Sequence, residues 1–434
     1  MKHTLRADKT QSYIYFFFGL SLPLRGAFIP GSSVVIIVDV VFLALVAVCL
    51  NYNKWKNVSY DLSFRDLAFL ALLIWSVISI VLAPIAIDLN SIAREIFLIL
   101  LFLFFRLGPF KTREVAYAIN GYILGCIATA LLGFFGVVLL AFFDITNAWA
   151  YALKDYPYLD GWARAHGLSL GPNMLGSVLV VALILSFLNE HSFRFSNVAL
   201  WAVRVILVLG CTLALSRSML ALVFAFLVTL FIFIPSVVYR RTAIALFFLV
   251  GFLFIFTSAN LVIQFSDINS YIGEPIGQSM VSHGNPIFVH SFGEKLQVEV
   301  YQSVYLELKK VALEVFYRYP LFGIGDGRFF GYLAENSGNL GYPESFSPYN
   351  PHSTYFGLLS ETGLIGFFIF ITFVGSVLLY FQRNRPSSLI HQKLFCISVL
   401  FLVYEGVNTD QLNFRHYIVF LALYLRSTAE PKVR

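Results

Sequence analysis

Long apolar segments recur along the whole chain. Because a helix needs about 20 mostly apolar residues to cross a bilayer, we predict about twelve membrane-spanning helices. They lie near residues 12–29, 33–50, 66–87, 92–107, 115–143, 172–188, 197–215, 218–238, 242–264, 353–381, 393–409 and 412–427. Of the 434 residues, 59% are hydrophobic and 12% charged, whereas a soluble domain carries about 25% charged residues. The pattern therefore predicts an all-α polytopic membrane protein.

Lysine and arginine gather in alternate connections between these segments. Lys54 and Arg65 lie between the second and third, and Arg240 and Arg241 between the eighth and ninth. The other short connections hold only Arg25, Arg94, Lys154, Arg164, Arg217 and Arg415. Because positively charged connections stay in the cytoplasm, we predict that both termini are cytoplasmic. The net charge of +6 follows this distribution and does not indicate a nucleic-acid partner.

Two connections on the predicted outer side are long, at residues 144–171 and 266–350. The first part of the second one is polar and typical of a loop. Residues 296–319 predict an amphipathic helix with Leu308 and Val315 on its apolar face, lying on or over the outer membrane surface. We therefore divide the chain into helices one to nine (1–264), a large periplasmic loop (265–351), and helices ten to twelve with a cytoplasmic tail (352–434).

Three polar turns on the outer side could carry chemistry: residues 164–167, residues 216–218 and residues 350–353. An arginine held close to the membrane by a turn as short as 216–218 is costly without a partner, and the guanidinium fork of Arg217 matches a phosphate or diphosphate. Alternatively, Arg217 snorkels or pairs with Asp144 or Asp160.

His352 follows Pro351 at the predicted start of the tenth span. Proline suits a helix start, and free N–H groups in the first helical turn favour an anion such as a substrate phosphate. The alternative is a capping turn with a surface histidine.

Other polar residues within the spans carry weaker signals. Asp39 and Glu361 are candidates for function or for helix–helix hydrogen bonds. The cysteines have neither metal nor disulfide spacing, so we expect no metal and no cofactor. They are Cys49, Cys126, Cys211 and Cys396.

Several short motifs resemble those of the O-antigen ligase and polymerase superfamily. His352-Ser353, nine residues and then Gly363-Leu364-Ile365-Gly366 resemble its His-[Asn/Ser/Gln]-x9-Gly-x-x-Gly signature. Residues 320–329 resemble its Pro-Leu-x-Gly-x-Gly-x-x-x-Phe segment. Ser216-Arg217 and residues 171–176 resemble its Ser-Arg turn and its Asn-Pro-Asn-type helix start. The resemblance covers roughly residues 60 to 430.

The resemblance implies a GT-C-like, metal-independent glycosyltransferase in the bacterial inner membrane. It would take a glycan from undecaprenyl diphosphate on the periplasmic side and pass it to an acceptor hydroxyl. Arg217 would bind the diphosphate, and His352 would act as general base or position the acceptor. The further substrate-binding candidates are Arg164, His166, Asn173, Lys309, Lys310, Arg328, Asn350 and Ser353.

The chain departs from the family pattern on the amphipathic helix. The family often has an arginine there, four residues before a tryptophan. Counted back from Pro320, these positions hold Tyr305 and Lys309. The candidates for a replacement cation are Lys309, Lys310 and Arg164.

The leading hypothesis is O-antigen ligation, with lipid A-core as acceptor and membrane lipid around the protein. Polymerisation of repeat units, with a second lipid-linked glycan as acceptor, is the main alternative, and a protein O-oligosaccharyltransferase belongs to the same class. A lipid-linked glycan transporter is the rival from another class, but it predicts midplane charges and internal repeats. A membrane scaffold would leave Arg217 and His352 unexplained.

Overall fold

The computed structural model of the chain describes most residues, and all structural statements below concern these residues. They are 2–24, 37–51, 62–85, 87–108, 110, 112–152, 163–169, 171–188, 197–214, 251, 259–265, 270–273, 288–292, 296–302, 304–336, 350–383, 397–399, 402, 406 and 415–429.

Nine long helices of the described residues coincide with predicted spans. They are α1 (Lys2–Ser21), α2 (Ile37–Asn51), α3 (Phe64–Leu82), α4 (Leu89–Leu107), α5 (Thr112–Phe143), α6 (Pro172–Leu188), α7 (Asn197–Leu213), α12 (Thr354–Arg383) and α15 (Arg415–Ala429). Three stretches, Phe64–Leu82, Arg113–Phe143 and Thr354–Tyr380, are long and apolar enough to cross a membrane, and shorter apolar helices accompany them. The protein is therefore a polytopic membrane protein. The predicted spans at 218–238 and 393–409 lie wholly or largely outside the described residues, so the count of twelve and the GT-C fold stay predictions.

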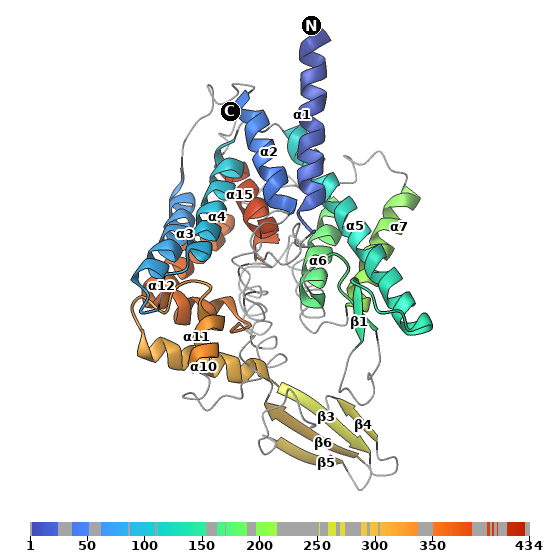
Figure 1. The fold of residues 1–434 in the computed structure, drawn as a ribbon, viewed down its shortest axis with the longest axis vertical. Helices are drawn as coiled ribbons and strands as arrows, with labels where there is room; N and C mark the ends of the chain where they lie inside the picture. Colours follow the sequence, from blue (N-terminus) through green and yellow to red (C-terminus); the bar gives the residue numbers. More distant parts are fainter. Residues whose placement is uncertain are drawn as a thin grey trace.

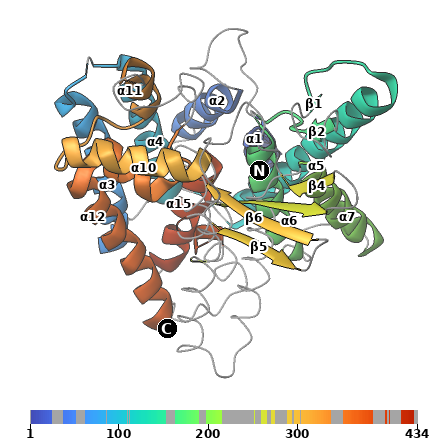
Figure 2. The ribbon, with the colours of Figure 1, turned by 90° about the horizontal axis from the view of Figure 1, so that it is seen from below.

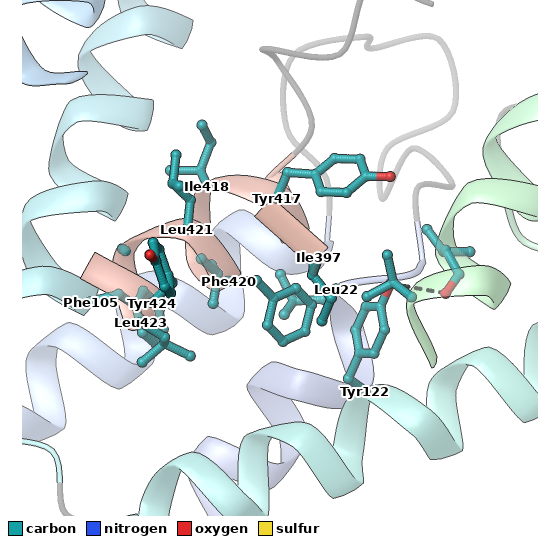
Figure 3. Close-up of a cluster of buried hydrophobic side chains, with 14 of the residues drawn as sticks. Leu22, Phe105, Tyr122, Ile397, Tyr417, Ile418, Phe420, Leu421, Leu423 and Tyr424 are labelled. Carbon is teal, nitrogen blue, oxygen red and sulfur yellow. Dashed lines mark hydrogen bonds between the residues drawn. The ribbon is translucent and has the colours of Figure 1, made fainter. Parts of the chain in front are cut away.

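The helices pack into one apolar core in which α4 and α15 occupy the middle (Figure 1). Glycines allow α1 to lie directly against α5, because a Cβ at Gly121 would collide with the backbone of Phe16. Phe18 of α1 stacks on Phe105 of α4, with ring centroids 5.0 Å apart. Figure 3 shows the side chains of α15, among them Phe420, gathered beside Tyr122 of α5.

Two arginine–aspartate ion pairs join helices of this bundle. At the end that carries both termini (Figure 1), Arg106 binds Asp66 through two hydrogen bonds of 2.5 and 2.7 Å. Arg415 binds Asp39 in the same manner at 2.7 and 3.0 Å, and its guanidinium lies 5.3 Å from the ring of Phe97 in the middle of α4. Which end faces the cytoplasm stays a prediction.

A four-stranded antiparallel sheet lies at the end far from the termini (Figure 1). Its strands are β3 (Ala259–Phe265), β4 (Ser270–Gly273), β5 (Phe288–Phe292) and β6 (Leu296–Gln302), in the order β4-β3-β6-β5. The fold is therefore mostly helical, as predicted, but not all-α: the predicted span 242–264 ends in β3, the predicted helix 296–319 begins with β6, and the predicted loop includes β4 and β5. In β6, Leu296, Val298 and Val300 alternate with polar residues, which is the period of a strand.

A second, smaller hairpin lies in the predicted connection 144–171. Its strands are β1 (Ala150–Ala152) and β2 (Ala163–Ala165), with Tyr151 opposite Arg164. Gly167 follows β2 with a positive φ of 55° and packs on the backbone of Thr129, so that a Cβ would collide there. The hairpin is thereby fixed against α5.

Two further helices cover the start of α12. They are α10 (Val304–Arg318) and α11 (Phe329–Asn336). Their apolar side chains form a core separate from that of the main bundle: Leu308, Val311, Ala312, Val315, Ile324, Phe329, Tyr332 and Leu333. Seen from below, α10 lies across the end of the molecule, with one end beside β6 (Figure 2).

Candidate functional site

His352 lies two residues before α12 in a conformation that few residues other than glycine adopt. Its φ is 47°, in the left-handed region, where an L-residue is destabilised by about 1–2 kcal/mol. Asn350 stabilises this turn, because its Oδ1 accepts a hydrogen bond of 3.1 Å from the His352 backbone N–H. Backbone strain of this kind is concentrated at functional sites, so the observed outlier makes His352 the first candidate.

Ser353 fixes the chain immediately after His352. Its Oγ donates a hydrogen bond of 3.0 Å to the carbonyl oxygen of Gly406, and its own carbonyl accepts the Gly357 N–H at 2.8 Å, which begins α12. The predicted helix-start turn at 350–353 is confirmed. Asn350 and Ser353 hold it in place, and their predicted contact with substrate stays untested.

The first half of α10 packs against His352. The Tyr305 ring meets the imidazole edge-on, with ring centroids 4.6 Å apart and planes at 65°. Lys309 follows one turn later on the same face of α10, and only 1% of its surface is exposed. Two segments of the chain that are remote in sequence therefore form one corner, which we name the His352 corner: Tyr305, Lys309 and His352.

Desolvation sets the charges in this corner. Loss of water around His352, together with the positive charge of Lys309, lowers the pKa of the imidazole to about 4. Burial likewise lowers the pKa of Lys309 to about 8. At neutral pH the imidazole is therefore uncharged and can accept a proton, while the lysine is still mostly a cation.

The two lysines of α10 have different surroundings. Lys310 is exposed and forms an ion pair of 2.9 Å with Glu307, which lies three residues earlier on the same helix. Lys309 is buried, and its charge acts on His352. Of the two, it is Lys309 that the structure brings to the histidine.

The predicted family motifs at 320–329 and 363–366 interlock. Gly363 interrupts α12 with φ 67° and ψ −167°, which frees helical carbonyl groups. Residues 320–329, named here the glycine turn, fill this break: Leu364 N–H donates to the Pro320 carbonyl at 2.8 Å. In return, Ile324 and Gly325 donate to the carbonyls of Ser360 and Glu361 at 3.0 and 2.8 Å.

Glycine is required at the contact points. Gly323 and Gly363 both have φ near 70°, and a Cβ on either would collide with the backbone of the other segment. Glu361 completes the junction, because its Oε1 accepts the Phe329 N–H at 2.9 Å at the start of α11. The sequence offered two roles for Glu361, in function or in a hydrogen bond between helices, and the hydrogen bond is confirmed.

Arg328 lies near the end of the glycine turn and not at the start of α10. The aliphatic part of Arg328 packs over Gly325, and the guanidinium of Arg94 over Gly327. Arg94 donates to Glu95 at 2.8 Å and lies 4.0 Å from Asp326. Because α10 runs about 14 Å from Lys309 to Arg318, Arg328 follows the end of α10 that is remote from Lys309.

A second polar corner, the Arg164 corner, consists of Arg164, His166 and Tyr151. Arg164 Nε donates 2.8 Å to the Ala214 carbonyl at the end of α7, and its Nη1 donates 3.3 Å to the Tyr151 hydroxyl. The His166 Nδ1 lies 3.2 Å from the Ser169 carbonyl. Asn173 follows in the first turn of α6 and is half-buried.

Arg217 lies outside the described residues. Ala214, which binds Arg164, precedes it by three positions. The predicted contact of Arg217 with a diphosphate, and its alternative pairing with Asp144 or Asp160, both stay predictions.

The sequence did not predict that Tyr305 belongs to the site. Tyr305 occupies the position at which the family often has an arginine, and its ring packs directly on His352. The four-residue spacing between Tyr305 and Lys309 was the available signal, since it places both on one helical face. Among the described residues, no three His, Cys, Asp or Glu side chains form a metal-binding group.

These features define a polytopic membrane protein whose candidate site lies where an extramembrane helix meets the start of a membrane span. Residues 202–371 match the family model described as O-antigen ligase, and this range includes α10, the glycine turn, His352 and Gly363. The match covers less than half of the chain, and within that segment it supports the resemblance to the O-antigen ligase and polymerase superfamily. Comparison with curated proteins finds no match.

Proposed function

We propose that the protein is a membrane glycosyltransferase that moves a glycan from undecaprenyl diphosphate to an acceptor hydroxyl. The reaction would take place on the periplasmic face of a bacterial inner membrane, with both termini in the cytoplasm. One observation carries the proposal: a neutral His352, held in a strained turn, lies beside the buried cation Lys309. Both residues fall in the segment that matches the O-antigen ligase family.

The proposed reaction is a single displacement at the anomeric carbon of the donor glycan. The acceptor hydroxyl oxygen forms a bond to this carbon, and the bond from the carbon to the diphosphate oxygen breaks. The hydroxyl proton passes to an imidazole nitrogen of His352, and undecaprenyl diphosphate leaves with the bonding electron pair. A neutral imidazole is needed for this role, because a protonated one has no acceptor site.

The cations of both corners would stabilise the leaving diphosphate. Developing negative charge needs fixed positive charge in a site with little water, and Lys309 supplies it next to His352. Arg217 is the second proposed contact, with Arg164 behind it. The diphosphate would also raise the pKa of His352, because a nearby negative charge favours the imidazolium, so the histidine becomes a better base once the donor is bound.

The remaining residues are proposed to orient the substrates. His166, which belongs to the Arg164 corner, and Asn173, in the first turn of α6, would contact the donor, as would the exposed Lys310. Asn350 and Ser353 would position the acceptor through the turn that they hold. Ligation to lipid A-core is the first choice of acceptor reaction, and polymerisation with a second lipid-linked glycan is the alternative.

Complementation in a cell that lacks the gene tests this proposal. Wild type, His352→Ala and Arg217→Ala would be compared at equal expression, with Arg318→Ala as a control for loss of an exposed arginine. We expect glycan on lipopolysaccharide with wild type and control, and none with the other two. Long polymer stranded on the lipid carrier would identify a ligase, and core bearing a single repeat a polymerase. A normal ladder from both site variants would refute the proposal.

A further inference from the structure

The apolar face of α10 is already occupied by protein. Leu308, Val311 and Val315 are fully buried in the core with α11. The sequence predicted that this face lies on the membrane surface, but the structure shows that protein already covers it. The exposed apolar residues lie instead at and beyond the end of α10: Tyr317 is 75% exposed, Leu321 53%, Phe322 39% and Phe330 51%. An apolar cluster of this kind in a membrane protein needs an occupant.

The glycine turn lies well inside the ends of two membrane-spanning helices. The Phe322 ring stacks on Trp75 of α3, with centroids 5.9 Å apart. Trp75 precedes the end of α3 at Leu82 by seven residues, about 10 Å along the helix. The turn also binds residues 360–364 of α12, which lie about 9 to 15 Å from its first residue. Measured along both spans, the turn is therefore at membrane depth.

The backbone of the glycine turn is suited to that depth. Irregular backbone inside a bilayer is tolerated only where protein groups satisfy its hydrogen bonds. Besides the two bonds to the carbonyls of α12, Asp326 N–H donates 3.3 Å to the Ser79 hydroxyl of α3, and Phe329 N–H donates to Glu361. Trp75 Nε1 donates 3.0 Å to the Thr362 carbonyl that the break at Gly363 leaves free.

The exposed residues continue an exposed apolar surface of α3. On α3, a span by length and composition, Ile74, Ile78 and Val81 are exposed large apolar residues. The glycine turn packs on the same helix through Trp75 and Ile80. Leu321 and Phe322 therefore extend the lipid-facing side of α3.

We propose that residues 320–329 form a re-entrant turn that enters one leaflet of the bilayer, with Leu321, Phe322 and Phe330 in contact with lipid acyl chains. Tyr317 lies at the interface, where tyrosine is favoured, and the exposed Arg318 beside it reaches the phosphate level. The turn thereby anchors the end of α10, and α10 carries Lys309 back to His352. This inference does not rest on glycan transfer.

Spin labelling of the full-length protein in phospholipid nanodiscs tests the depth of the turn. Cysteine would be introduced at Leu321, Phe322 or Phe330, and the accessibility of the attached label to oxygen and to a water-soluble nickel complex would be measured. Ile78→Cys calibrates a lipid-facing position, and Glu314→Cys and Glu335→Cys calibrate exposed positions on α10 and α11. The unsubstituted protein, labelled in parallel, supplies the background from the native cysteines.

We expect the oxygen-to-nickel ratio at Leu321 and Phe322 to be several times that at Glu314 and to approach that at Ile78. Ratios at the turn equal to those at Glu314 and Glu335 would overturn the proposal. All substituted residues are exposed, so the variants are expected to fold, and thermal unfolding of each verifies this. Because the readout is depth and not transfer, failure here leaves the proposed function standing, and the reverse also holds.

Discussion

The two polar corners lie at the same end of the bundle but differ in their contact with water (Figure 1). In the His352 corner, Lys309 is buried and His352 is half-buried, and the loss of water around them lowers both pKa values. In the Arg164 corner, the arginine is half-buried and rests on a main-chain carbonyl and a tyrosine hydroxyl. Desolvation can lower the pKa of a histidine or a lysine enough to change its charge near neutral pH, whereas a guanidinium stays charged in almost any environment.

The difference suggests that the two corners have different roles in the reaction. The buried corner holds groups whose protonation can change during a reaction, so it suits the transfer of a proton. The more open corner offers a permanent cation and suits the binding of an anionic group. If this division is correct, substitutions in the two corners should have different kinetic signatures, and the predictions below aim at that contrast.

The largest effect is expected from His352. His352→Ala should lower the transfer rate by about 10²–10⁴-fold, the usual contribution of a general base, and His352→Gln should not restore it, because an amide cannot take the proton. The measurement is the initial rate of purified protein in nanodiscs with lipid-linked donor and acceptor. Arg164→Gln should instead act mainly on the KM for the donor. Equal effects of the two substitutions on kcat and KM would argue against the division.

The adjacent lysines of α10 provide a matched pair. Lys309→Met should lower the transfer rate on the order of 10²-fold, as expected for loss of one group that stabilises developing charge. Lys310→Met also removes one positive charge, but from the adjacent residue, which lies on the protein surface. It should have little effect on the transfer rate. Both variants can be compared in the same assay. A larger loss with Lys310→Met would show that the wrong lysine has been assigned to the site.

The junction between the glycine turn and α12 predicts a stability difference. In Gly363→Ala, the alanine would have to adopt a positive φ, and its Cβ would collide with the backbone of Leu321. We therefore expect the free energy of unfolding to fall by about 2 kcal/mol or more. Gly375→Ala, on the same helix, meets no atom within 4 Å and should be neutral or slightly stabilising. Apparent melting temperatures in detergent would reveal the difference. Similar melting temperatures for the two variants would contradict the interlocked junction.

The smallest effect is a dependence on pH. Burial lowers the pKa of Lys309 to about 8, so this side chain is charged below pH 8 and becomes neutral above it. The KM for the donor should therefore rise severalfold as the pH passes through this value. Lys309→Arg, whose group stays charged, should remove the rise. His352, with a pKa of about 4, should cause no change between pH 6 and 8 before donor binds.

Much of the architecture followed from the sequence because it depends on local patterns. Apolar length predicted the helices α1 to α7, α12 and α15, and Pro351 with His352 predicted the start of α12. The ion pair of Glu307 and Lys310 also depends only on local spacing, because the two residues lie three positions apart on one helix.

The parts that were missed depend on contacts between distant segments. The strand β6 has an alternating pattern, but its seven residues lead almost directly into α10. The sequence therefore predicted one helix over 296–319, which includes both elements. The burial of Lys309 against His352 arises from the packing of α10 on α12, which no local pattern encodes. The motif glycines could be recognised, but only the structure shows that Gly323 and Gly363 are needed for each other.

The most direct test of the account is an experimental structure of the protein with undecaprenyl diphosphate bound in nanodiscs. The account predicts that the diphosphate lies within hydrogen-bonding distance of Lys309 Nζ, with His352 facing the position of the anomeric carbon and Arg217 on the opposite side of the phosphates. A diphosphate bound away from Lys309 and His352, or an Arg217 that lies too far from His352 to share one ligand with it, would contradict the account.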